Sequence, residues 1–293
     1  MVFRRSAVPE TASAAALVVY DYLLNFGREV TLIWLSPWTY TKVLYLVVRY
    51  LPFLAFVIFI RIQLYLGVTV ASCVWMYPVV VWATTVSTFT AEVVMMIRTW
   101  AVWGRDKRVA AFFLTLCCLY IGLATAGNVK FNRSVVFAEP PYPGYRGCLV
   151  VEASKSLTND YSMLVVMEFF VCVLTAWSAV RSSKTGTTNR LSAIIHRDGI
   201  LFYLYLLVGS VANVIFFTAP VIPLELHAAF VPICLALYTN LTSRVVLNIR
   251  EVAREGRNKS AMETQLHDYR DDEGVQEPTV IPLSLRSRQK EFQ

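Results

Sequence analysis

The sequence has few charged residues for its length. Only 16% of its 293 residues are Asp, Glu, Lys or Arg, whereas 56% are hydrophobic; in a soluble domain about 25% of residues are charged. A soluble protein has to cover its surface with polar groups, while a surface that faces lipid has to be apolar. The shortage of charge therefore excludes an ordinary soluble globular domain and predicts an integral membrane protein.

The sequence also lacks the common patterns of metal and nucleotide sites. It contains three histidines, no HExxH or CxxC motif and no glycine-rich phosphate loop. Residues 225–247, the last apolar segment, contain no lysine that could hold retinal as a Schiff base. We therefore expect no enzyme, no cofactor and no metal site. The Lys and Arg residues lie in short clusters between apolar segments rather than along one face, so nucleic acid is not an expected partner.

Seven apolar segments predict an all-α, polytopic bundle of seven transmembrane helices. A helix needs about 20 mostly apolar residues to cross the hydrocarbon of a bilayer. The segments that meet or approach this length are residues 12–35, 43–60, 78–100, 109–127, 162–180, 200–219 and 225–247. We expect residues 1–250 to form this bundle, embedded in a lipid bilayer that is more plausibly the plasma membrane than an internal membrane.

The first of these segments is the weakest, because polar residues interrupt it. Asp21, Asn25 and Arg28 stand at i, i+4 and i+7, which places them on one face of a helix. Charged side chains in a spanning helix have to face protein or water. We therefore expect this face to point into the bundle, and the alternative is a helix that lies at the interface without spanning.

The distribution of basic residues predicts that the N-terminus lies outside and the C-terminus inside. Lys and Arg accumulate on the cytoplasmic side of membrane proteins. In this orientation the basic clusters at 98–108, 181–197 and 244–259 all fall inside. Residues 251–293 would then form a cytoplasmic tail, and residues 260–293 have too few large apolar side chains to fold. The outer loop at 128–160 contains a glycosylation sequon at Asn132, whose use stays open.

Several segments together resemble a family of basidiomycete fungal membrane proteins that carry the domain of unknown function 6533. The segments are YDYLLNFGREVTLIW at 20–34, RYLPF at 49–53, IRTWAVWGRDKR at 97–108, PGYRGC at 143–148, HRDGILFYLYLLVGSVANVIFFTAP at 196–220 and LTSRVVLNIRE at 241–251. The resemblance implies a family domain at about 18–60, seven helices with receptor-like topology and no established activity. Asn25 and Gly27 depart from the family pattern, which affects only local helix packing.

Two cysteines are candidates for a disulfide bond. Cys73 precedes the third predicted span and Cys148 lies in the long outer loop, so both would face the oxidising side of the membrane. We predict a Cys73–Cys148 disulfide that tethers the loop, as in many seven-helix receptors; the alternative is two unpaired thiols. The other four cysteines lie within predicted spans and are expected to be packing residues.

Charged residues in the first three spans predict a network in the cytoplasmic half of the bundle. Glu29 would pair with Arg49, and Glu92 with Arg98 or Arg28, because an unpaired charge in hydrocarbon costs several kcal/mol. Such a network could act as a lock that opens when the bundle rearranges, or only as static structure.

Polar residues deeper in the bilayer predict a pocket that opens outward. Asp21, Glu168 and Asn213, with His227 as a further candidate, have aromatic neighbours in the sequence and would suit a small amphipathic or cationic ligand. We therefore expect a receptor or sensor that binds a small ligand outside and couples to cytosolic signalling proteins. The alternative is a small-solute transporter or channel, although no internal repeat is evident.

Overall fold

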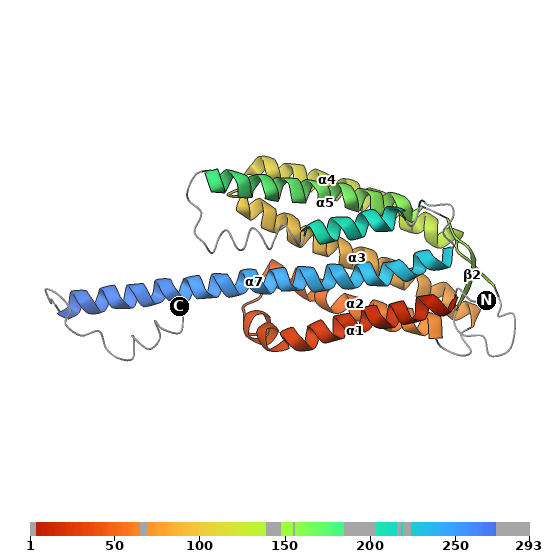
Figure 1. The fold of residues 1–293 in the computed structure, drawn as a ribbon, viewed down its shortest axis with the longest axis horizontal. Helices are drawn as coiled ribbons and strands as arrows, with labels where there is room; N and C mark the ends of the chain where they lie inside the picture. Colours follow the sequence, from red (N-terminus) through yellow and green to blue (C-terminus); the bar gives the residue numbers. More distant parts are fainter. Residues whose placement is uncertain are drawn as a thin grey trace. The chain divides into compact units, whose positions relative to one another are not determined.

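The computed structural model describes residues 4–64, 69–138, 148–154, 156–184, 203–215, 218 and 224–273. Within these ranges the chain is all-α apart from one small sheet, and it forms seven helices (Figure 1). The helices are α1 (Arg4–Glu29), α2 (Tyr40–Leu64), α3 (Val70–Val102), α4 (Lys107–Ser134), α5 (Leu157–Lys184), the helix Tyr203–Ile215 and α7 (Leu224–Glu273). A π-helix, η1 (Val30–Trp34), follows α1, and β1 (Val136–Ala138) pairs antiparallel with β2 (Leu149–Glu152).

Five helices in the described residues are long and apolar enough to cross a membrane. They are Tyr40–Gln63, Val70–Val102, Lys107–Ser134, Leu157–Arg181 and Phe230–Gln265. Large apolar side chains such as Val57, Leu114 and Trp177 are exposed on them, as expected where a surface meets lipid. The chain is therefore a polytopic membrane protein. Helix α1 and the Tyr203–Ile215 helix are not among the five, because the first carries charges and the second is short.

Helix α3 packs against three other helices. It contacts α2, α4 and α5, while α1 packs on α2 and α4 lies along α5 (Figure 1). The largest group of buried apolar side chains comes from α2, α3, α4, α5, the Tyr203–Ile215 helix and α7, and includes Met95, Tyr120, Met167 and Leu206. Polar residues from these helices that point inward are therefore brought close together.

Local sequence explains where α3 and α4 begin and end. The Thr69 hydroxyl accepts a hydrogen bond from the Ser72 amide at the start of α3, and the Asp106 carboxylate accepts one from the Arg108 amide at the start of α4. Between the two helices, Gly104 and Arg105 both adopt a positive φ. Glycine enters this left-handed conformation without steric cost and commonly terminates a helix there. The result is a tight basic turn between α3 and α4.

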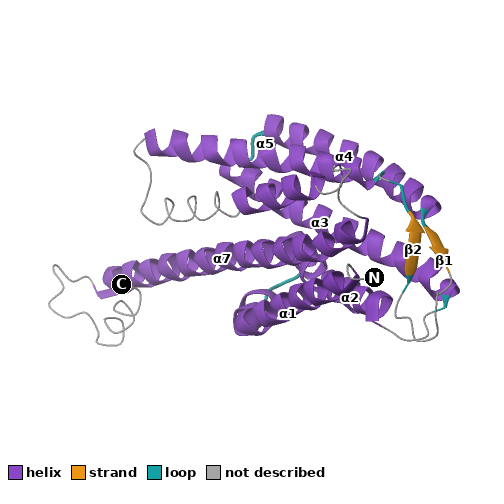
Figure 2. Cartoon of the chain, turned by 45° about the vertical axis from the view of Figure 1, so that its right-hand side comes forward, coloured by secondary structure: helices purple, strands orange, loops and turns teal. Residues whose placement is uncertain are grey.

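A disulfide-linked hairpin covers the opposite end of α3. Cys73 and Cys148 form the predicted disulfide, with their Cα atoms 5.8 Å apart. The Cys148 amide also donates to the carbonyl of Ile62 near the end of α2, over 2.9 Å. Figure 2 shows β1 and β2 at the end of the bundle where α4 ends. The predicted outer loop is shorter than expected, because α4 extends to Ser134, and its Pro/Gly-rich part at 139–147 lies outside the described residues.

The C-terminal helix is longer than the sequence indicates. Residues 260–273, which we expected to be unfolded, belong to α7, whereas residues 274–293 lie outside the described residues. The segment contains Ala261, Met262, Glu263 and Leu266, which favour helix despite the scarcity of apolar residues. The chain divides into two compact units, residues 1–247 and 248–293.

Candidate functional site

Four charged residues from three helices, three of them buried, form one cluster in the bundle. The Arg49 Nη1 atom of α2 lies 2.7 Å from Asp21 Oδ2 of α1, and Arg49 Nε lies 3.5 Å from Glu29 Oε2. The Nε atom of Arg244 on α7 lies 2.7 Å from Asp21 Oδ1. We call Asp21, Glu29, Arg49 and Arg244 the charge cluster. Its two acids and two bases balance, which allows it to be stable within a membrane protein.

The sequence of α1 brings the two acids to the same side of the helix. The buried positions are Thr11, Ala14, Val18, Asp21, Asn25 and Glu29. These positions are three or four residues apart, so they form one face of the helix. The Asn25 amide donates to the carbonyl oxygen of Asp21 over 2.9 Å and to its Oδ1 atom over 3.2 Å. Arg28, which we expected on this face, is half-buried, and Glu29 occupies its place in the core.

Aromatic residues complete the environment of the charge cluster. The Glu29 Oε1 atom accepts hydrogen bonds from the Tyr50 hydroxyl (2.6 Å) and from Trp34 Nε1 (3.3 Å). Trp34 ends the π-helix η1, whose wider turn follows Glu29 directly. The guanidinium of Arg49 lies 5.3 Å from the centre of the Tyr22 ring. These contacts hold both side chains in a fully buried position.

The structure brings together only part of the predicted charge network. Glu29 and Arg49 lie together, as the sequence suggests. Arg28 donates to Asn25 Oδ1 over 3.5 Å, and the guanidinium of Arg98 lies 5.8 Å from the centre of the Tyr203 ring. Glu92 of α3 takes no part in these ion pairs, and its carboxyl group instead lies near that of Glu168 on α5. Asp21, which we predicted in the ligand pocket, belongs to the charge cluster instead, and so does Arg244.

Glu92 and Glu168 belong to a second buried group, which we call the interior polar cluster. It consists of Glu92 on α3, Glu168 on α5, Ser210 and Asn213 on the Tyr203–Ile215 helix, and Cys234 and Tyr238 on α7. Glu168 Oε1 accepts from the Ser210 hydroxyl over 2.9 Å and from the Tyr238 hydroxyl. The side chain of Asn213 lies near the Cys234 thiol, which donates to the carbonyl oxygen of Gly209. All six side chains are buried.

The predicted ligand pocket is divided between these two clusters. Asp21 belongs to the charge cluster, whereas Glu168 and Asn213 belong to the interior polar cluster. The side chain of His227 lies outside the described residues. Helical spacing gives the inward face of each helix, but it does not say which inward faces meet. For that reason these polar residues could be predicted from the sequence as buried, but their grouping could not.

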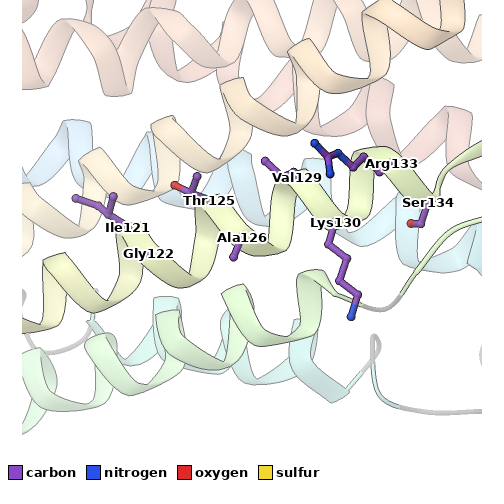
Figure 3. A pocket seen from close by; sticks show the side chains of 8 residues that line it. All are labelled: Ile121, Gly122, Thr125, Ala126, Val129, Lys130, Arg133 and Ser134. Atoms are coloured by element: carbon purple, nitrogen blue, oxygen red, sulfur yellow. The ribbon is translucent and has the colours of Figure 1, made fainter.

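One described pocket lies along α4 instead. Figure 3 shows its lining side chains, which all come from α4 and run from Ile121 to Ser134. The pocket has a volume of about 720 Å³ and is broadly open. Its lining is largely apolar, with Lys130 and Arg133 near one end. None of the residues that we predicted as ligand contacts lines it.

Asp160 is a buried acid that the sequence analysis did not single out. It lies in the first turn of α5, and its carboxyl group packs directly against Gly127 of α4, where a Cβ atom would collide with it. Glycine at 127 therefore allows α4 and α5 to approach closely. In the sequence Asp160 stands beside the polar residues Thr158, Asn159 and Ser162, before the predicted span 162–180, so no apolar context marked it as buried. Within the described part of the chain, no three His, Cys, Asp or Glu side chains are grouped so that they could hold a metal ion.

Comparison with known proteins identifies one domain. Residues 11–54 match a family that is described as a family of unknown function, DUF6533. No curated protein matches the sequence. The matched segment runs from α1 through η1 into α2, and it contains Asp21, Glu29 and Arg49. Three of the four residues of the charge cluster therefore lie within the family domain.

Proposed function

We propose that this chain, which carries a DUF6533 domain, is a seven-helix membrane receptor or sensor for a small extracellular ligand. The observation that carries the proposal is the charge cluster, which joins the DUF6533 domain to α7 through the Asp21–Arg244 contact. In this proposal, α1 and the Tyr203–Ile215 helix are the two further spans beside the five long apolar ones. The protein lies in the plasma membrane, with its N-terminus outside the cell and its C-terminus in the cytosol.

The two ends of α3 support this orientation. The disulfide-linked hairpin lies at the end where α3 begins, and an oxidising extracellular environment favours disulfides. Arg105, Lys107 and Arg108 surround the turn at the other end of α3, as the positive-inside rule expects for a cytoplasmic turn. Two independent chemical preferences therefore favour the same orientation.

The charge cluster combines the buried ion pairs of Arg49 with the more exposed pair of Arg244, and this combination suits a switch. Arg49 is fully buried between Asp21 and Glu29, so breaking its pairs is costly. The Arg244 side chain is 47% exposed and meets the cluster only through Asp21, so this contact breaks more easily than the buried pairs of Arg49. Asp21 also keeps Arg49 when Arg244 leaves. The Arg244 contact can therefore open at low cost while the rest of the cluster stays intact, which is the two-state behaviour that a receptor needs.

Substituting Arg244 tests the switch. Arg244→Gln is expected to increase ligand-independent recruitment of cytosolic proteins while changing thermal stability and surface expression little, because only the weak contact is lost. Proximity labelling in cells measures the recruitment. Arg254→Gln, an exposed position further along α7, is the matched control and is expected to behave like the wild type. Equal loss of folding and recruitment in Arg244→Gln would contradict the switch and make the cluster static structure.

The ligand itself is sought by thermal stabilisation. A compound that binds only the folded protein raises its unfolding free energy, by about 2.7 kcal/mol at a hundred times its dissociation constant. Purified protein is therefore screened against small amphipathic and cationic compounds. A compound that stabilises the protein is expected to change recruitment in cells, and this change is expected to differ in Arg244→Gln.

A small-solute transporter or channel is the second candidate. The Glu92–Glu168 carboxyl pair favours it, since acids within the membrane commonly mark ion or proton pathways. Protein reconstituted into vesicles without cytosolic partners separates the two proposals. Solute flux through such vesicles would support a transporter and contradict the receptor.

A further inference from the structure

We propose that the interior polar cluster binds one small monovalent cation, a proton or Na⁺, between the carboxyl groups of Glu92 and Glu168. This goes beyond the receptor proposal, because it assigns a ligand to a site that the ligand switch does not use. It rests on the arrangement of oxygen atoms, on buried acceptors that lack donors, and on the charge of the surrounding groups.

The interior polar cluster is rich in oxygen atoms. Four helices bring together two carboxyl groups, two hydroxyl groups and one amide, from Glu92, Glu168, Ser210, Tyr238 and Asn213. The Ser210 and Tyr238 hydroxyls lie 2.7 Å apart, and both contact Glu168 Oε1. Oxygen atoms are the preferred ligands of hard cations. The Ser210 and Tyr238 contacts fix one edge of Glu168 and leave its other oxygen available.

Three oxygen atoms in this cluster are buried and lack hydrogen-bond donors in the described part of the chain. They are Glu92 Oε1, Glu168 Oε2 and Asn213 Oδ1. The three residues are 1%, 3% and 1% exposed. An unsatisfied buried acceptor costs about 1–3 kcal/mol. All three atoms accept and cannot donate when the carboxyls are ionised, so a cation or a shared proton would satisfy them where another acceptor would not.

The charge of the surroundings also requires a cation. Two ionised carboxylates close together in a low-dielectric interior repel each other strongly, and a cation between them removes this repulsion. The charge cluster balances its own acids with Arg49 and Arg244. In the described part of the chain, the titratable groups that face Glu92 and Glu168 from the neighbouring helices are Cys117 and Tyr120 of α4, Cys172 of α5, and Cys234 and Tyr238 of α7. None of these five groups carries positive charge, so the remaining negative charge is left for a bound cation.

The test uses the full-length protein, purified in detergent, and measures its thermal unfolding midpoint. NaCl is titrated against N-methyl-D-glucamine chloride at constant ionic strength, over a series of pH values. If Na⁺ occupies the site, the midpoint rises and saturates with Na⁺, and the Na⁺ concentration for half of the effect rises about tenfold for each unit of decreasing pH, because protons compete. If only protons occupy it, the midpoint rises as pH falls and Na⁺ has no effect.

Substitutions assign the effect to the cluster. Glu92→Gln and Glu168→Gln are each expected to abolish the Na⁺ dependence and reduce the pH dependence, whereas Glu152→Gln, exposed in β2, should leave both unchanged. Should the glutamine variants fail to fold, Tyr238→Phe keeps both carboxyls, removes one hydrogen bond to Glu168 and is expected to shift the half-saturating Na⁺ concentration or the pH midpoint. Dependence that is absent in the wild type, or unchanged in these variants, would overturn the proposal while leaving the receptor proposal intact.

Discussion

Arg49→Gln is expected to lower the free energy of unfolding by about 3–5 kcal/mol, which is the usual cost of removing one partner from a buried ion pair. The guanidinium of Arg49 is fully buried and faces both Asp21 and Glu29. Removing it leaves Glu29 without a basic partner in the charge cluster and Asp21 with Arg244 alone. Denaturation of the purified protein in mixed micelles measures the loss, and reduced yield of folded protein should accompany it.

A combined substitution separates lost charge balance from lost packing. Glu29→Gln, added to Arg49→Gln, removes one acid together with one base and leaves the Asp21–Arg244 pair. This double variant should restore most of the stability, because replacing a whole buried ion pair is often neutral. Arg61→Gln, exposed near the end of the same helix, is the control and should change stability by less than about 0.5 kcal/mol. If the double variant is less stable than Arg49→Gln alone, charge balance does not explain the role of the cluster.

Loss of the Cys73–Cys148 disulfide is expected to destabilise the protein by about 2–4 kcal/mol. The bond closes a segment of 75 residues, and the hairpin is otherwise attached to α2 by the backbone hydrogen bond from Cys148 to Ile62. Cys73→Ala and Cys148→Ala should therefore be equally destabilising, and the double variant no worse than either. Thermal unfolding of the purified variants measures the effect.

The disulfide prediction has a direct chemical control. Cys118→Ala removes an exposed thiol from α4 and should leave stability unchanged. Non-reducing peptide mapping of protein from native membranes should recover Cys73 and Cys148 in one linked peptide. Recovery of both as free thiols would show that the hairpin is not covalently attached to α3 in the cell.

The approximate positions of the helices could be predicted because membrane lipid imposes a simple rule. Each described helix overlaps one of the seven apolar segments, since a backbone in hydrocarbon has to satisfy its own hydrogen bonds. The Cys73–Cys148 pairing could be predicted because these two cysteines are predicted to lie on the oxidising side of the membrane, whereas the other four lie within predicted spans. The extent of α7 could not, because its last turns are helical without being apolar.

The partners of the buried charges could only partly be predicted. Glu29 and Arg49 lie on helices that follow each other in the chain, so their pairing was a local inference. The contact of Asp21 with Arg244 joins the first helix to the last, and the contact of Glu92 with Glu168 joins α3 to α5. Such contacts depend on which helices are neighbours, and helical periodicity carries no information about that.

We propose that α1 crosses the membrane because Arg49 and Arg244 neutralise its acids. Selective labelling of epitopes at the two termini, in intact and in permeabilised cells, tests this claim most directly. If α1 spans, an epitope before Met1 is expected to be labelled in intact cells. An epitope after Gln293 is expected to be labelled only after permeabilisation. Labelling of both epitopes on the same side would contradict it, because the chain would then cross the membrane an even number of times.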